Sequence, residues 1–253
     1  MAGVDYQGFA AGDNTVIWRY VSAARFGDLL AGQLYFAAAH EFDDPFEGAI
    51  TQAENARRQQ EMTRIFPDDT ARRRTLCGLS EAFADLRRMT KISCWHARAH
   101  ENVAMWERYR PAAGCGVAVA STVGALKRSL REFRLQPSYG AEPISIGTVR
   151  YIDYATEAMT NSSMLGIFLH KRVEYQDETE VRALLSLRMA VEFGVEIPDD
   201  GVTVSVDPRE LIDEVRVSPN ATPAEVEELA EAARTADIDC RVSRSTLGSE
   251  PTY

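Results

Sequence analysis

Residues 17–22 (IWRYVS) and residues 178–182 (ETEVR) are the two stretches that decide the predicted fold. The first is a short apolar run with β-branched residues, a pattern typical of a buried strand. It carries Arg19 near its end, where a buried strand meets solvent. The second opens a later strand with two glutamates. We interpret the rest of the chain as the scaffold that brings these two stretches together.

The composition predicts a soluble globular protein. The chain has 253 residues, of which 45% are hydrophobic and 26% charged, enough for one large domain or two small ones. Its net charge of −10 argues against wholesale wrapping of nucleic acid. Residues 1–13 lack the cationic and apolar segments of a signal peptide, and no run approaches the roughly 20 apolar residues of a membrane span. We expect a single cytoplasmic domain over residues 1–253.

The cysteines predict neither disulfides nor a zinc site. They are far apart and include no Cys-x-x-Cys pair, so we expect free thiols in a reducing compartment. One spacing, Cys94-x-His96-x3-His100, would suit a metal if its histidines lay on a helix. Cys94 instead ends a strand-like run, and we predict no metal. The four cysteines are Cys77, Cys94, Cys115 and Cys240.

The order of elements favours the α+β class. The chain opens with a strand over 15–20, a helix capped by Ser22 and ended by Gly32, and a strand over 34–36. Further strands are predicted at 91–95, 117–120, 144–151, 180–186, 202–206, 212–217 and 238–242. Helices are predicted at 49–90 with a break at 67–70, and at 101–109, 121–133, 164–173 and 222–235.

Few of these elements form strand–helix–strand crossovers, so we expect a split, mostly antiparallel sheet with peripheral helices. The core is predicted to cover about 15–220, with a strand–helix–strand segment, 202–244, packed on it. The arginine-dense helices of 49–90 are interpreted as a solvated face, with a patch for an anionic partner as the alternative. No dinucleotide-binding glycine motif, P-loop or hydrolase elbow occurs.

Several blocks in a fixed order resemble a widespread prokaryotic family catalogued as a domain of unknown function. The blocks begin with Trp18-Arg19-Tyr20-x-Ser22 and Phe42-x-Asp44-Pro45-Phe46-Glu47-Gly48. They continue with Ser93-Cys94-Trp95, Met105-Trp106-x-x-Tyr109 and Glu178-x-Glu180-x-Arg182. The resemblance covers roughly residues 17 to 220. The family name carries no established activity.

The chain has a more distant resemblance to ADP-ribosyltransferases. One class of those enzymes uses an arginine on the first strand, a serine motif on a middle strand and a Glu-x-Glu on a late strand. Arg19, Ser93 and Glu178-x-Glu180 follow that order here, although Ser93-Cys94-Trp95 departs from the usual Ser-Thr-Ser. The resemblance implies an ADP-ribosyltransferase-like fold. It also implies an enzyme that cleaves NAD+ and transfers ADP-ribose to a protein, a nucleic acid or water, in a toxin or anti-phage defence effector.

The resemblance also implies roles for individual residues. Glu180 would stabilise an oxocarbenium-like transition state, and Glu178 would orient or deprotonate the acceptor. Arg19 would pair with the diphosphate, because its planar fork suits phosphate. The other residues implied to contact NAD+ are Tyr20, Ser22, Tyr35, Ser93, Trp95 and Trp106.

Alternatives remain open at this stage. Arg19 could be a surface residue paired with Asp44 or Glu47, and Glu180 could belong to an exposed ladder of charges with Arg182. The protein could instead be a non-catalytic module of a defence system that binds a nucleotide or a protein. It could also be a metal-dependent nuclease that uses the carboxylates of Asp43, Asp44 and Glu47. A homodimer is also left open.

Overall fold

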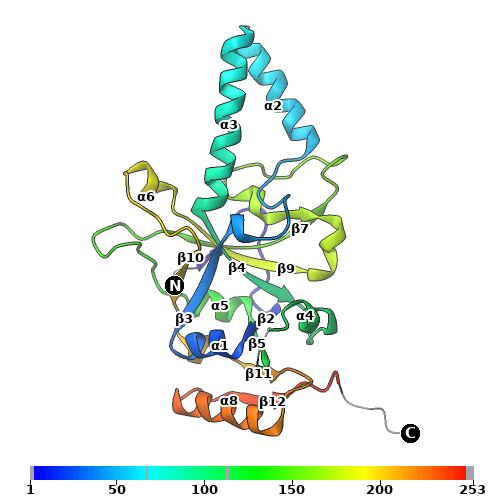
Figure 1. Cartoon of the computed structure of the whole chain (residues 1–253), viewed down its shortest axis with the longest axis vertical. Coiled ribbons are helices and arrows are strands. Elements are labelled where there is room, and N and C mark those ends of the chain that lie inside the picture. The colour runs from blue at the N-terminus through cyan, green and yellow to red at the C-terminus, as the bar shows by residue number, and fades with distance from the viewer. Residues whose placement is uncertain (1–2, 67, 112–113, 249–253) are drawn as a thin grey trace.

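A computed structural model, described over residues 3–66, 68–111 and 114–248, shows a mixed α/β protein. Its centre is a large, mostly antiparallel sheet with helices on its faces and at its ends (Figure 1). The neighbouring strands run β1 (Gly3–Asp5), β6 (Ile144–Thr148), β9 (Glu180–Ser186), β4 (Thr90–Ala97), β2 (Val16–Ser22), β5 (Gly116–Thr122), β11 (Glu214–Val217) and β12 (Arg241–Arg244). β3 (Gln33–Ala38) pairs with both β4 and β10 (Gly201–Ser205).

The helices begin where the sequence provides caps. Ser22 caps α1 (Ala23–Leu30), and Thr222 forms a capping box with Glu225 at the start of α8 (Pro223–Thr235). The others are α2 (Gln52–Ile65), α3 (Asp69–Met89), α4 (Val103–Arg108), α5 (Val123–Ser129), α6 (Arg188–Glu192) and α7 (Pro208–Leu211), with short 3₁₀ segments at η1 (Ala39–Glu41), η2 (Gly166–Leu169) and η3 (Val173–Glu178).

The sheet forks along one edge of β4. β2 pairs with β4 only at the end of that strand, where Trp18 lies opposite His96. β3 pairs with β4 only near its start, where Ala37 lies opposite Ile92. The backbone of β4 between these two pairings faces a gap on this edge. We call the gap the fork.

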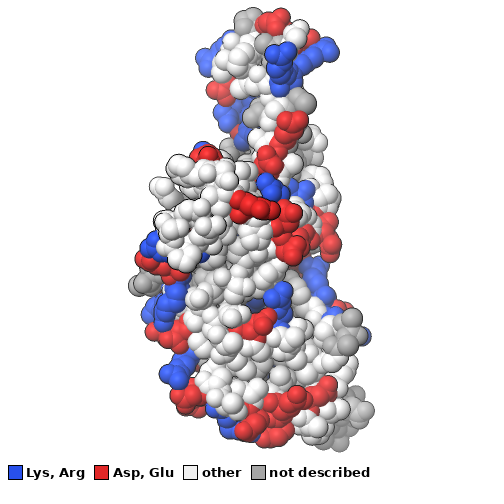
Figure 2. Space-filling view, turned by 60° about the vertical axis from the view of Figure 1, so that its left-hand side comes forward, with Lys and Arg blue, Asp and Glu red and all other residues white. Residues whose placement is uncertain are grey.

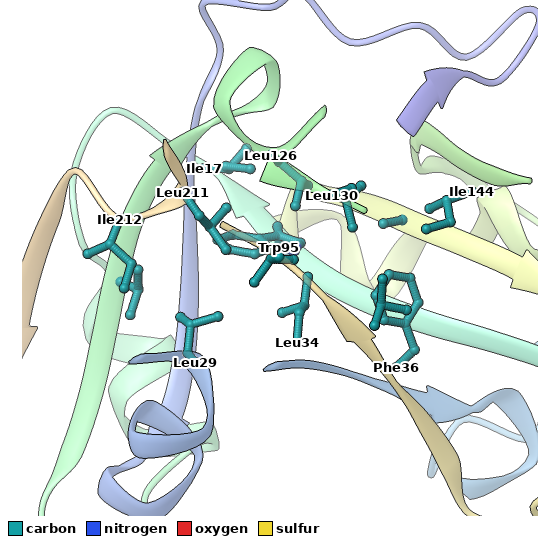
Figure 3. Packing of buried hydrophobic residues seen from close by; sticks show 14 of the residues in the cluster. Ile17, Leu29, Leu34, Phe36, Trp95, Leu126, Leu130, Ile144, Leu211 and Ile212 are labelled. Carbon is teal, nitrogen blue, oxygen red and sulfur yellow. The ribbon is translucent and has the colours of Figure 1, made fainter. Parts of the chain in front are cut away.

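Side chains alternate between two faces of the central strands. One face, here the Trp95 face, carries the main core, with Ile17, Trp95 and Val181 packed under Phe26 of α1 and Leu126 of α5. Figure 3 shows Trp95 surrounded by aliphatic side chains from several elements. The other face, here the Glu180 face, is covered by α4, the 3₁₀ segments and the loop over 42–50. The two faces differ in chemistry, because the first is apolar and the second holds most of the buried charge.

α2 and α3 form a helical arm that projects from the sheet (Figure 1). Figure 2 shows basic side chains gathered at its outer end, whereas the opposite end of the molecule is rich in acidic ones. Within the arm, Arg57 pairs with Glu54, and Arg72 and Arg73 pair with Asp69. This pairing agrees with the solvated helix face predicted from the sequence.

Most predicted elements are present, and two predictions were wrong. The helix predicted at 164–173 is instead η2 followed by β8 (His170–Arg172), which pairs with β7 (Arg150–Ile152) in a small second sheet. The run is apolar enough for a helix, but strand pairing and ion pairs of its cations prevail over that local preference. The strand predicted over 144–151 is divided between the two sheets, as β6 and β7.

The segment at 202–244 completes the main sheet. β10 pairs with β3, and β11 lies between β5 and β12. The mostly antiparallel α and β architecture is therefore as predicted. β1 and α6 were not predicted from the sequence.

Candidate functional site

The register of the sheet places Arg19 and Glu180 on opposite faces. Trp18 lies opposite His96, and His96 lies opposite Glu180, so these three share a face. Arg19 is the neighbour of Trp18 and therefore leaves β2 on the Trp95 face. Among the described residues, no single cleft joins Arg19 to Glu180 as the resemblance implied. A strand alternates its side chains, and the sequence alone could not relate the alternation of β2 to that of β9.

Arg19 fills the fork. Its guanidinium donates one hydrogen bond to Ser93 Oγ, one to the Cys94 carbonyl at 3.2 Å and one to the Tyr35 carbonyl at 2.9 Å. It also lies 5.7 Å from the ring centroid of Trp95. The structure thus brings together four of the residues implied to contact NAD+: Arg19, Tyr35, Ser93 and Trp95. We call this group, together with Arg25, the fork cluster.

The charge of Arg19 has no counter-charge within the described residues. Every acceptor that it contacts is neutral, and it forms no ion pair there, so it is not the partner of Asp44 or Glu47. Burial lowers the pKa of Arg19, opposed by Cys94 and Tyr109, and Arg25 lowers it further. A half-buried cation without a counter-charge favours an incoming anion.

A small hollow of about 60 Å³ opens beside Arg19. It is also lined by Arg25, Asp28 and Tyr35. The guanidinium of Arg25 stacks over the Tyr35 ring at 4.1 Å, and Arg25 also pairs with Asp28 at 3.3 Å. The hollow therefore presents two guanidinium groups with one carboxylate at its rim. Ser22 caps α1 nearby but is not among the residues that line the hollow.

The Glu180 face holds a network of three carboxylates and three cations. Arg182 binds Glu47 through two hydrogen bonds, at 2.6 and 3.0 Å, and Glu180 through a third at 2.5 Å. Lys171 bridges Glu180 at 2.8 Å and Glu178 at 2.5 Å. Arg108 forms an ion pair with Glu178 from the solvent side. These six residues make up what we call the buried network.

The local backbone allows both glutamates to reach Lys171. Thr179, between them, has a φ of 45°, in the left-handed region that non-glycine residues seldom adopt. Glu178 ends η3 and Glu180 begins β9. The turn at Thr179 joins the two elements so that both carboxylates reach Lys171. Glu180 and Arg182 are 3% and 0% exposed, so they form no exposed ladder of charges.

Burial and ion pairing shift the pKa values of Glu180 and Glu47 in opposite directions. Burial raises the pKa of Glu180, but the attraction of Arg182 and Lys171 is stronger and holds it far below its usual range. At Glu47, burial outweighs the attraction of Arg182, so that pKa is raised. Glu180 is thus held ionised and bonded to cations. Both of its oxygens already accept hydrogen bonds from cations and its side chain is buried, which does not suit contact with a ribose.

An aromatic group packs beside the network. Tyr20 contacts His96, Trp106 and Tyr109 at centroid distances of 5.8, 5.0 and 6.2 Å. Burial lowers the pKa of His96 to about 4 and raises that of Tyr20 to about 12. Tyr20 and Trp106 are therefore packed against the Glu180 face and do not belong to the fork cluster.

The carboxylates of the Asp-Pro-Phe-Glu loop are bound by arginines. Asp44 pairs with Arg172 at 2.9 Å, and Glu47 with Arg182. No group of three metal-ligating side chains forms among residues 3–66, 68–111 and 114–248 where side chains are described. The nuclease alternative therefore has no geometric support there. Cys94, Cys115 and Cys240 are free thiols, and the side chain of Cys77 lies outside the described residues.

The sequence signalled some members of the buried network and missed others. Lys171 was interpreted as a cation at a helix end, because the helix prediction for its segment was wrong. Arg108 and Arg25 gave no signal, since each is one arginine among many. Only the pairing of distant strands identifies their partners.

No described helix combines the length and apolarity that crossing a bilayer requires. A comparison of the chain with protein-family models, with curated proteins and with solved structures finds no match.

Proposed function

We propose that the protein is a nucleotide-binding module whose fork cluster binds the phosphate groups. The observation that carries this proposal is the half-buried Arg19 guanidinium, which contacts only neutral acceptors and borders a hollow with a second arginine. Guanidinium groups bind phosphate through paired hydrogen bonds, more strongly than they bind neutral acceptors. A bound phosphate would supply the missing counter-charge.

The dimensions of the hollow favour a phosphate group at this position. Its volume of about 60 Å³ exceeds several-fold the space that one water needs, and it is too small for a whole nucleotide. The ribose and base would therefore extend outward past Tyr35. Asp28 opposes binding, because its carboxylate repels an anion and pairs with Arg25.

Cleavage of NAD+ stays a prediction from the resemblance and is not what the geometry favours. Glu180 lies on the face opposite to Arg19, and its oxygens are bound by Lys171 and Arg182. A catalytic carboxylate must reach the ribose of the substrate. We therefore propose binding without cleavage, in which NAD+ is one of the nucleotides to be tested.

Calorimetric titration with ADP, NAD+ and inorganic phosphate tests the proposal. We expect all three ligands to bind. Arg19→Gln should lower the affinity for each ligand by about tenfold or more, which corresponds to the loss of a charge-assisted hydrogen bond. Arg188→Gln is the control, because Arg188 pairs with Glu192 at the surface away from the fork. Undiminished binding by the Arg19 variant would refute the proposal.

A second assay separates binding from catalysis. The protein is incubated with NAD+ and nicotinamide release is followed, with Glu180→Gln in parallel. We expect no release above the buffer rate from either protein. Release by the wild type that the substitution abolishes would establish the enzyme and overturn the non-catalytic proposal.

A further inference from the structure

Another cavity lies at the base of the helical arm, and none of the residues that line it belongs to the fork cluster. Its volume is about 540 Å³, within the range of small-molecule sites. It is enclosed by the loop after Pro45, the first turns of α2 and the last turns of α3 (Figure 1). The residues that carry the argument are Ile50, Gln52, Asn55, Arg58, Phe83 and Arg87. We call this space the arm cavity.

Arg87 provides an unmatched cation. Its Nε atom is buried and has no hydrogen-bond partner, and Arg87 forms no ion pair within the described residues. A buried donor without an acceptor is unfavourable, typically by about 1–3 kcal/mol, and native structures seldom retain one without a reason. A ligand oxygen in the arm cavity would satisfy it.

Two other features of the cavity wall, the N-terminus of α2 and Arg58, also favour an anionic ligand. The N-terminus of the 14-residue α2 opens at the cavity wall, where Thr51 is its cap, and helix N-termini attract anions. Arg58 also lines the cavity, although Glu54 already binds its Nε at 3.3 Å. Glu47 at the floor does not oppose an anion strongly, because both of its oxygens bind Arg182.

The rest of the wall is apolar and flat. The guanidinium of Arg58 lies 5.0 Å from the centroid of the Phe83 ring, and Ile50 also lines the cavity. Gln52 and Asn55 are exposed and supply neutral amides at the rim. Such a wall accommodates a planar apolar body beside the charged group.

We propose that the arm cavity binds an amphipathic organic anion, in which a carboxylate or phosphate contacts Arg87 and a flat apolar body packs on Phe83. The proposal does not depend on the function proposed for the fork cluster, because none of its residues belongs to that cluster.

The test compares matched probes by calorimetric titration of the full chain. 2-Naphthoate and 2-naphthyl phosphate carry the anionic groups, and 2-naphthamide has the same ring system without charge. We expect both anions to bind wild-type protein about tenfold or more tightly than the amide. In the Arg19→Gln background, which removes the phosphate site proposed at the fork, Arg87→Gln should reduce the affinity for both anions to that for the amide.

Two further variants protect this test against misfolding and against binding elsewhere. Asn55→Asp adds a negative charge at an exposed rim position, so it should weaken the anions and leave the amide unchanged. Arg64→Gln, at an exposed position in the outer half of α2, should change nothing. The proposal is overturned by equal affinity for charged and neutral probes, by anion binding that persists when Arg19→Gln and Arg87→Gln are combined, or by binding of all three probes that Arg19→Gln alone abolishes.

Discussion

Arg19 and Arg182 lie on opposite faces of one sheet and differ in the partners that surround them. Arg182 binds two carboxylates, Glu47 and Glu180, within a closed network. Arg19 binds a hydroxyl and two carbonyls and keeps an unmatched charge beside a hollow. The charge of Arg182 is therefore balanced within the protein, whereas Arg19 contacts no carboxylate among the described residues. Burial alone does not distinguish a structural arginine from a binding one, but the identity of its acceptors does.

The largest difference between the two arginines is expected when each guanidinium is removed in turn. Arg182→Met should lower the free energy of unfolding by about 3–5 kcal/mol, because Glu47 stays buried without its ion-pair partner and Glu180 keeps only Lys171. Arg19→Met should lower it by only about 1–3 kcal/mol, because it leaves neutral acceptors without a donor. Urea unfolding measures both, with Arg188→Met as a surface control that should barely change stability. Equal losses for Arg19 and Arg182 would contradict the distinction.

The pH dependence of the free energy of unfolding tests the Glu180 face, and the expected effect is of intermediate size. His96 has a pKa of about 4 in the folded protein, below the ordinary value of 6.5, chiefly because of burial. The unfolded chain therefore binds the extra proton first as pH falls through 6.5. Stability contributed by the neutral ring is present above that pH and is lost progressively toward pH 4.

Between pH 7 and pH 5 the loss from His96 should be about 2 kcal/mol, since each pH unit below 6.5 contributes about 1.4 kcal/mol. His96→Gln should show a correspondingly smaller decline in urea unfolding over this range. His40→Gln, at an exposed position, is the matched control. Identical declines in the wild type and the His96 variant would show that this imidazole is not kept neutral by the fold.

The smallest effect concerns the rim of the fork cluster. Asp28→Asn removes the carboxylate that pairs with Arg25 at 3.3 Å and repels an incoming phosphate. We expect ADP to bind about two- to fivefold more tightly, because an exposed ion pair of this kind is weak. Calorimetric titration measures the change. Weaker binding by the variant would mean that Asp28 orients Arg25 productively rather than competing with the ligand.

The sequence predicted strands well where they carry a buried apolar run, and predicted residue proximity poorly. β2, β4 and β9 lie where their patterns indicated, and so do α1, α4 and α8. Lys171 was assigned to a helix, because residues 164–169 form an apolar run and the cations at 170–172 suit the C-terminus of a helix. Pairing with β7 and contact with Glu178 and Glu180 decide its structure, and neither is visible locally.

The candidate site follows the same division. Arg19, Ser93, Tyr35 and Trp95 were expected together from a resemblance, and the structure does place them at the fork. Glu178 and Glu180 were expected with them and lie on the other face. The unmatched Arg87 was one of many arginines in a helix, and nothing in the sequence separated it from those that pair within the arm.

The sequence by itself determined the alternation within each strand, the caps that start α1 and α8, and the charge of every side chain. These follow from the chemistry of neighbours along the chain. The tertiary structure alone decided which face of one strand meets which face of another, and hence which charges meet. Glu47 and Arg182 are 135 residues apart. The register of β9 against β4 sets the face from which Arg182 extends, and the loop over 42–50 brings Glu47 to that face. The same register leaves Arg19 without a carboxylate, because it directs Glu180 to the opposite side of the sheet.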